Sequence, residues 1–290
     1  MIQKKLLGVI LGAVLLPIAC SKPTIAPVET IPERSKSVQE SAQETGTPDI
    51  LSTYCRVDVI TPVVVKTVSA MMREDVVTYV SELSSQGNIE KLMLVARAIG
   101  NEEQYQDVLQ NLGPKIKEFI NRRDAVAQKI NESSLENLKN DIVRGVFAEN
   151  QLPVAFYFLS LKTAQQNQFD ESVEYFKCAA KNYYDPLSMF KLAQLYKYGS
   201  DEFQKKRPEL VIKKRIEKND RLAFFWIIAG INVDTVRMFG LLDASTSLGW
   251  NTIAMMDTYQ NTEQNFDRDE VYKEVNAFVA LKYPGLTRKP

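Results

Sequence analysis

The spacing of apolar residues limits the fold of this chain more than any other feature. From about residue 70 onward, apolar side chains recur at intervals of three and four, which places them on one face of a helix. Glycine, asparagine and an Asp-Pro pair stand between these stripes, as is typical of helix ends. We therefore expect an all-α fold in which antiparallel helices are joined by short turns.

Several residues predict where individual helices begin. Asn88 is expected to cap one helix, and residues 101–104 (Asn-Glu-Glu-Gln) have the pattern of a capping box for the next. Pro114 suits the first turn of a helix, and Asp185-Pro186 combines an N-cap with a first-turn proline.

Residues 55–69 do not fit the helical pattern. They are rich in β-branched residues and interrupted by Pro62, so we expect either a short strand pair or an extended arm there. No other segment suggests a sheet.

Composition excludes several classes of function. The 290 residues include no histidine, which removes Ser-His-Asp and Cys-His nucleophiles and histidine-ligated metal sites. Three cysteines are too few for a four-cysteine zinc or iron–sulfur site, and there is no glycine-rich phosphate-binding motif. Lysine plus arginine equals aspartate plus glutamate, 36 each, so we expect no basic field for nucleic acid. We predict no catalytic residue, no cofactor and no metal.

The first twenty residues have the organisation of a secretory signal. A short basic segment with Lys4 and Lys5 precedes an apolar run over residues 6–19. This run is shorter than the roughly 20 residues that a helix needs to cross a bilayer. A permanent membrane helix is therefore the weaker interpretation.

The end of this run, Pro-Ile-Ala-Cys at residues 17–20, resembles the lipobox of bacterial lipoproteins, with proline in place of the usual aliphatic residue. The resemblance implies that residues 1–19 are removed and that Cys20 carries acyl chains, which are enough for stable attachment to a membrane. Ser21 after the cysteine implies sorting to the outer membrane, with the protein on the periplasmic side. A plain signal peptide and an uncleaved anchor are the alternatives.

Residues 20–50 are expected to form a tether. They are rich in serine, threonine, proline, glutamate and glutamine, and they contain few large apolar side chains. Such a segment cannot offset the entropy of ordering by burial. We expect a lipidated, disordered spacer between the membrane and a folded region that begins near residue 51.

Two segments fifty residues apart are similar to each other. FDESVEYFKCAA (169–180) and NDRLAFFWIIAG (219–230) share an aspartate expected to cap the helix, an aromatic pair and a small pair. The matched residues are Asp170 and Asp220, Tyr175 and Phe225, Phe176 and Trp226, Ala179 and Ala229, and Ala180 and Gly230. Similarity at a fixed period is typical of helical solenoids.

Between these segments, DPLSMFKLAQLYKYG (185–199) has small, leucine, tyrosine and glycine positions at the spacing of Sel-one-like repeats, which are relatives of the tetratricopeptide repeat. Ser188 and Ala193 stand where that family usually has alanine and glycine. The resemblance covers about residues 151–256 and implies a solenoid of helical hairpins that acts as an adaptor, assembly factor or host-interaction protein. An ordinary helical bundle is the alternative.

The predicted organisation follows from these features. Residues 51–150 are expected to form divergent hairpins of the same solenoid, and residues 151–256 the repeats, with a basic insertion at 201–218. Residues 257–290 are expected to form a capping helix (269–281) and a tail.

The insertion is the most conspicuous candidate for binding a partner. Between residues 205 and 218 it has seven cations and two glutamates. We expect it to bind an acidic protein, lipid phosphates or a peptidoglycan carboxylate, unless it is only a solvated loop. The cations are Lys205, Lys206, Arg207, Lys213, Lys214, Arg215 and Lys218.

Two further groups have two interpretations each. Cys55 and Cys178 are the thiols left once Cys20 is lipidated; they can form a disulfide in an oxidising compartment, or Cys178 can be a buried apolar filler. Four tyrosines can line a concave groove or pack between repeats. They are Tyr183, Tyr184, Tyr196 and Tyr198.

These observations predict a non-enzymatic, lipid-anchored envelope protein that binds an unidentified protein through its repeats. The alternative is a protein that binds or cleaves peptidoglycan, with carboxylates in a cleft supplying the chemistry. Glu171-Ser172 superficially matches the Glu-Ser pair of helical lytic transglycosylases. However, Glu171 lies in a predicted first helical turn, where an acidic side chain suits the helix dipole.

Overall fold

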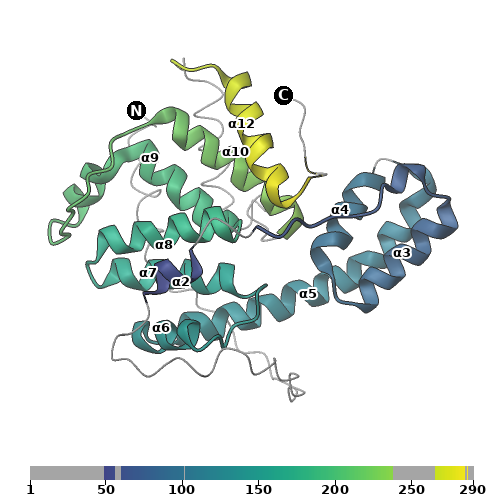
Figure 1. Ribbon diagram of the computed structural model, residues 1–290, viewed down its shortest axis with the longest axis horizontal. Coiled ribbons are helices and arrows are strands. Elements are labelled where there is room, and N and C mark those ends of the chain that lie inside the picture. Colours follow the sequence, from purple (N-terminus) through teal and green to yellow (C-terminus); the bar gives the residue numbers. More distant parts are fainter. Residues whose placement is uncertain (1–48, 56–59, 101, 238–264, 285, 287–290) are drawn as a thin grey trace, which may run out of the picture. The chain divides into compact units, whose positions relative to one another are not determined.

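The computed structural model describes residues 49–55, 60–100, 102–237, 265–284 and 286, without the side chains of 120 and 235–237. These residues form helices and no strand, which confirms the all-α prediction for the described part of the chain (Figure 1). The α-helices are α2 (Ile50–Tyr54), α3 (Arg73–Ser85), α4 (Ile89–Ile99), α5 (Gln106–Glu132), α6 (Leu135–Val143), α7 (Leu152–Gln165), α8 (Phe169–Asn182), α9 (Pro186–Lys206), α10 (Asp220–Arg237) and α12 (Arg268–Lys282), and two 3-10 helices are η1 (Val68–Ala70) and η2 (Glu103–Tyr105).

Side-chain caps start several helices where the sequence predicts them. The Asn88 side chain accepts a hydrogen bond from the amide of Lys91 at the start of α4. Asp185 accepts one of 2.7 Å from the amide of Ser188, and Pro186 occupies the first position of α9. Each of these caps satisfies a donor that the first helical turn leaves free.

The capping box expected at 101–104 stays a prediction. Residue 101 lies outside the described residues, and the next residues form η2 before α5 begins at Gln106. The Gln104 side-chain amide donates to the Glu102 carboxylate at 2.8 Å.

Pro114 does not begin a helix, because α5 continues through it from Gln106 to Glu132. Val108 and Leu112 bury one end of α5 against α3 and α4, while Ile130 buries the other end against α6 and α7. Packing at both ends stabilises a helix that proline alone would interrupt.

The aspartates of the repeat are not N-caps either. The cap position of α8 is Gln168, and the α10 cap is Asn219, whose side chain accepts from the Leu222 amide at 2.9 Å. Asp170 and Asp220 lie within the first turn, where the positive end of the helix dipole still favours them.

Three apolar clusters hold the described residues together. One joins α8, α9, α10 and α12, and a second joins α2, the end of α5, α6, α7 and α8. The third joins η1, α3, α4 and the start of α5. Helix α8 contributes Phe176 to the first cluster and Tyr175 to the second, so two of its faces are buried.

The helices from α7 onward pack in chain order. Helix α8 lies against α7 and α9, and α10 lies against α9 and α12 (Figure 1). Only residues 166–168 separate α7 from α8, so these two helices form an antiparallel hairpin. The small positions of the repeat allow close packing: a Cβ atom on Gly230 would lie 3.0 Å from the Phe190 ring.

The segment before η1 is an arm and not a strand pair. Residues 60–67 have no regular secondary structure, and residues 56–59 lie outside the described part. The Val63 amide donates to the carbonyl of Lys282 at 2.6 Å, and Val63 and Val65 pack against the cluster around α10 and α12.

Candidate functional site

The basic insertion is fixed to the scaffold along its length. The Arg207 guanidinium donates to the carbonyl of Ala164 at 3.3 Å and to the Asn167 side chain at 2.7 Å, in the turn between α7 and α8. The backbone amides of Lys213 and Lys214 donate to the two carboxylate oxygens of Asp170, at 2.9 and 3.1 Å. The backbone of this segment is therefore held against α7 and α8, while most of its side chains are exposed.

The return of the insertion toward α10 is also held. Ser200 exchanges two hydrogen bonds with the backbone of Ile216, and the Asn219 amide donates to the carbonyl of Tyr196 at 2.7 Å. Gly199 bends α9 here, with φ 71° and ψ 165°. A Cβ atom on Gly199 would lie 3.2 Å from the Ile216 carbonyl oxygen, so glycine permits this close approach.

The seven cations of the insertion divide into two groups, and Lys218, which pairs with Asp220 at 3.9 Å, belongs to the first. Arg207 holds the insertion in place, Lys205 pairs with Glu202 at 2.6 Å, and Arg215 pairs with Asp201. The pKa of Lys205 is raised by its hydrogen bond to Glu202. The second group has exposed side chains for which the described residues provide no ion-pair partner within 4 Å; it comprises Lys206, Lys213 and Lys214.

A hollow of about 410 Å³ lies between the insertion and α8. Its volume is in the range of sites that bind small molecules or peptide side chains. Four cations, three carboxylates and several apolar groups surround it. The lining residues are Asp170, Val173, Glu174, Lys177, Tyr196, Lys214, Arg215, Ile216, Glu217, Lys218 and Asn219.

Two of the three carboxylates in the hollow have partners inside the protein. Both oxygens of Asp170 accept backbone amides of the insertion, and Glu174 pairs with Lys177 at 2.9 Å. Glu217 is exposed on the rim. Asp170 thus holds the wall of the hollow, which leaves Glu217 as the carboxylate most available to a ligand.

Glu171 and Ser172 lie in structural contacts of α8. The Glu171 carboxylate accepts hydrogen bonds from Lys139 at 2.9 Å and Tyr175 at 2.7 Å, and the Ser172 hydroxyl donates to the Ser160 carbonyl at 2.8 Å. Burial acts to raise the pKa of Glu171, but the hydrogen bonds outweigh it and the pKa is lowered. A glycosidase acid needs the opposite shift.

The four tyrosines do not form one groove. Tyr184 is fully buried, stacks on Phe278 at 4.8 Å and donates to the carbonyl of that residue. Tyr183 stacks on Phe156 at 5.1 Å. Only Tyr196 lines the hollow, and Tyr198 is 39% exposed.

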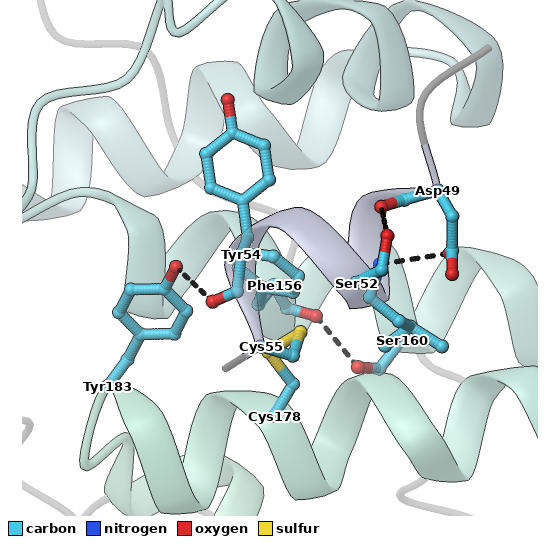
Figure 2. Close-up of a disulfide and its surroundings, with 9 residues drawn as sticks. Asp49, Ser52, Tyr54, Cys55, Phe156, Ser160, Cys178 and Tyr183 are labelled. Carbon is cyan, nitrogen blue, oxygen red and sulfur yellow. Dashed lines mark hydrogen bonds between the residues drawn. A yellow bond between two sulfur atoms is a disulfide. The ribbon is translucent and has the colours of Figure 1, made fainter. Parts of the chain in front are cut away.

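Cys55 and Cys178 form a disulfide, with sulfurs 2.01 Å apart and Cα atoms 5.2 Å apart (Figure 2). The bond joins the residue after α2 to the middle of α8. Cys178 is also 96% buried among the apolar residues of its cluster, since only 4% of it is exposed. Cys178 is thus both a partner in the disulfide and a buried apolar residue, which were alternatives in the sequence analysis.

Sequence reasoning missed Asp170 as the anchor of the insertion. An aspartate in the first turn indicates that a helix begins there, but it carries no information about contacts with residues 43 and 44 positions away. It also missed the outward face of α8, with Glu174 and Lys177, because an exposed charged face is common to most surface helices.

Cys20 lies outside the described residues. Among the helices of the described residues, none is long and apolar enough to cross a membrane. Comparisons with protein-family models, with curated proteins and with solved structures found no match to the chain.

Proposed function

We propose that this chain is a lipid-anchored protein of a bacterial envelope that holds another protein at the membrane through tandem helical hairpins, without catalysing a reaction. The hairpins are of the Sel-one-like kind, stacked as a solenoid from α7 onward. Helix α12 covers the last repeat: Val271, Val275 and Val279 are buried, and its opposite face is exposed.

The observation that carries this proposal is the shared environment of α8 and α10. Each packs against the helix that precedes it, and each buries the small residues of the repeat. Ala179 and Ala229 are both fully buried, while Phe176 and Trp226 are 6% and 5% exposed. The aromatic partners differ, since Phe176 contacts Tyr157 of α7 and Trp226 contacts Phe278 of α12. Solenoid repeats usually keep the spacing between neighbouring helices, while the aromatic contacts differ from one repeat to the next.

The disulfide supports export of the chain. Structural disulfides persist in oxidising compartments and are rare in the cytosol of most organisms. A bond between Cys55 and Cys178 therefore agrees with a signal sequence that directs the chain to the envelope. It also leaves Cys20 as the one thiol available for acylation.

The anchor is tested by the mass of the mature chain isolated from native envelopes. Cleavage before Cys20 with added acyl chains is the expected result, and a Cys20→Ala variant should move from the membrane to the soluble fraction. A Cys20→Ala variant that still sediments with membranes would contradict lipid anchoring.

The scaffold is tested by amine-reactive crosslinking in intact envelopes, followed by isolation of the full-length chain. We expect the same partner protein in independent preparations, in an amount comparable to the chain. A control isolation without the crosslinker, from envelopes unfolded in urea, should lose that partner. Recovery of the chain alone would contradict a scaffold role.

A second candidate function is binding or cleavage of peptidoglycan, which the carboxylates in the hollow favour. Glu217 and Glu174 are the residues that would act there, since Asp170 is held by backbone amides. Release of soluble glycan fragments from purified sacculi tests this. Release that a Glu174→Gln/Glu217→Gln variant abolishes would establish the second function and overturn the non-enzymatic proposal.

A further inference from the structure

We infer that the hollow between α8 and the insertion is the place where the partner binds, and that it takes a segment of the partner that carries aspartate or glutamate next to an apolar side chain. The inference rests on the proposed scaffold function and names the site and the chemistry of the partner.

The walls of the hollow are preorganised. Arg207, the pair of amides on Asp170 and the exchange between Ser200 and Ile216 fix the insertion at three points along its length. A segment that is already ordered loses little conformational entropy when a ligand binds to it. A long insertion used only as a connection would not need to be fixed in this way.

The lining combines an apolar part with a cationic rim. Val173, Tyr196 and Ile216 provide apolar surface from α8, α9 and the insertion. Tyrosine is among the residues enriched at protein interfaces because its ring is apolar and its hydroxyl is polar. One apolar side chain of a peptide can therefore be buried in this part.

The rim attracts carboxylates. Lys214 lines the hollow with an exposed side chain and without an ion-pair partner among the described residues, whereas Lys218 forms a long ion pair of 3.9 Å with Asp220. Lys213 is exposed beside them. The internal partners of Asp170 and Glu174 reduce the repulsion that these carboxylates would exert on an anionic ligand, so Glu217 is the rim carboxylate that opposes such a ligand. Lys213 and Lys214 can pair with an incoming carboxylate and lose no ion pair within the described residues, while Lys218 would exchange its long pair with Asp220.

A zero-length carbodiimide reagent tests this inference, because it joins a lysine amine to a carboxylate only where the two are in contact. Native envelopes that contain the full-length chain are treated with the reagent, and the crosslinked peptides are identified by mass spectrometry. We expect amide bonds from Lys214 or Lys218 to aspartate or glutamate of the same partner that the amine-reactive reagent captures.

A charge-reversed variant and a matched control make the result specific. Lys214→Glu/Lys218→Glu should reduce capture of the partner by about tenfold, through loss of attraction and new repulsion. Lys115→Gln/Lys117→Gln changes two exposed lysines of α5 and should leave capture unchanged. Thermal unfolding of both variants should match the original chain, because all four side chains are exposed.

The outcomes separate the two proposals. Absence of any captured partner with the amine-reactive reagent overturns the scaffold function itself. A different outcome is a partner that is captured without any carbodiimide bond to the rim lysines, or in the same amount by the charge-reversed variant. Either result overturns only the proposal that the partner binds in the hollow. Phosphodiester headgroups of lipids form no bond with the rim lysines in this reaction, so a lipid ligand of that kind would give the same negative result.

Discussion

The Tyr183 hydroxyl donates a hydrogen bond of 2.9 Å to the backbone carbonyl of Tyr54, one residue before the disulfide at Cys55 (Figure 2). A disulfide and a hydrogen bond thus hold the end of α2 to the C-terminal half of α8 and the residue that follows it. Helix α2 has only five residues and would not be stable alone. The first described helix is therefore fixed to α8 by a covalent bond and a hydrogen bond.

Removal of the disulfide should destabilise the protein. A Cys55→Ser/Cys178→Ser variant should lose about 3 to 5 kcal/mol of unfolding free energy, because the bond closes a long loop in the unfolded chain. Chemical denaturation measures this loss, and reductant should reproduce it in the original chain without affecting the variant. Tyr183→Phe, which removes only the hydrogen bond, should cost about 1 kcal/mol. Equal denaturation midpoints for the original chain and the two variants would contradict a stabilising role for the disulfide and the hydrogen bond.

Gly199 should tolerate a side chain less well than another glycine with a positive φ. Gly199→Ala should cost about 1 to 3 kcal/mol, because its backbone conformation is nearly restricted to glycine and the new Cβ would crowd Ile216. Gly145 has φ 67° with open space around it, so Gly145→Ala should cost about 1 kcal/mol. Faster hydrogen exchange at the Ile216 amide in the Gly199 variant alone would show that the insertion is released.

The cations of the insertion should differ in their effect on stability. Arg207→Ala should lower the unfolding free energy by about 1 to 2 kcal/mol, because two hydrogen bonds to the α7–α8 turn are lost. Lys206→Ala, at the neighbouring exposed position, should change it by less than about 0.5 kcal/mol. Thermal and denaturant unfolding of the two variants make the comparison. Similar losses in both would show that Arg207 does not fix the loop.

Local chemistry in the sequence predicted much of the helical structure and less of the site. Asn88 and Asp185 cap helices because a short polar side chain needs only the next turn to do so. Pro114 was misjudged because packing at both ends of α5 overrides a local preference. The hollow depends on Asp170 meeting Lys213 and Lys214, a contact between distant positions that no local pattern encodes.

The contribution of Glu171 to stability should depend on pH. Its pKa is lower in the folded chain, where Lys139 and Tyr175 donate to it against the effect of burial, than in the unfolded chain. The contribution is therefore fully present above about pH 4.5 and is lost as the pH falls through the lowered folded value. Glu171→Gln should cost about 0.5 kcal/mol at pH 7, because the pair is partly exposed, and less in acid.

A double-mutant cycle with Lys139→Gln provides the control for this prediction. At pH 7 the two substitutions together should cost less than the sum of their separate effects, because either one removes the same ion pair. A constant cost of Glu171→Gln between pH 7 and acid would contradict the proposed ionisation.

The most direct test of the account is the distribution of the captured partner between membrane and soluble fractions of cells. With the original chain, the partner should be found at the membrane, and with Cys20→Ala it should move to the soluble fraction together with the chain. The Lys214→Glu/Lys218→Glu chain should remain at the membrane and release the partner. A partner whose location is the same in all three strains would contradict a lipid-anchored scaffold.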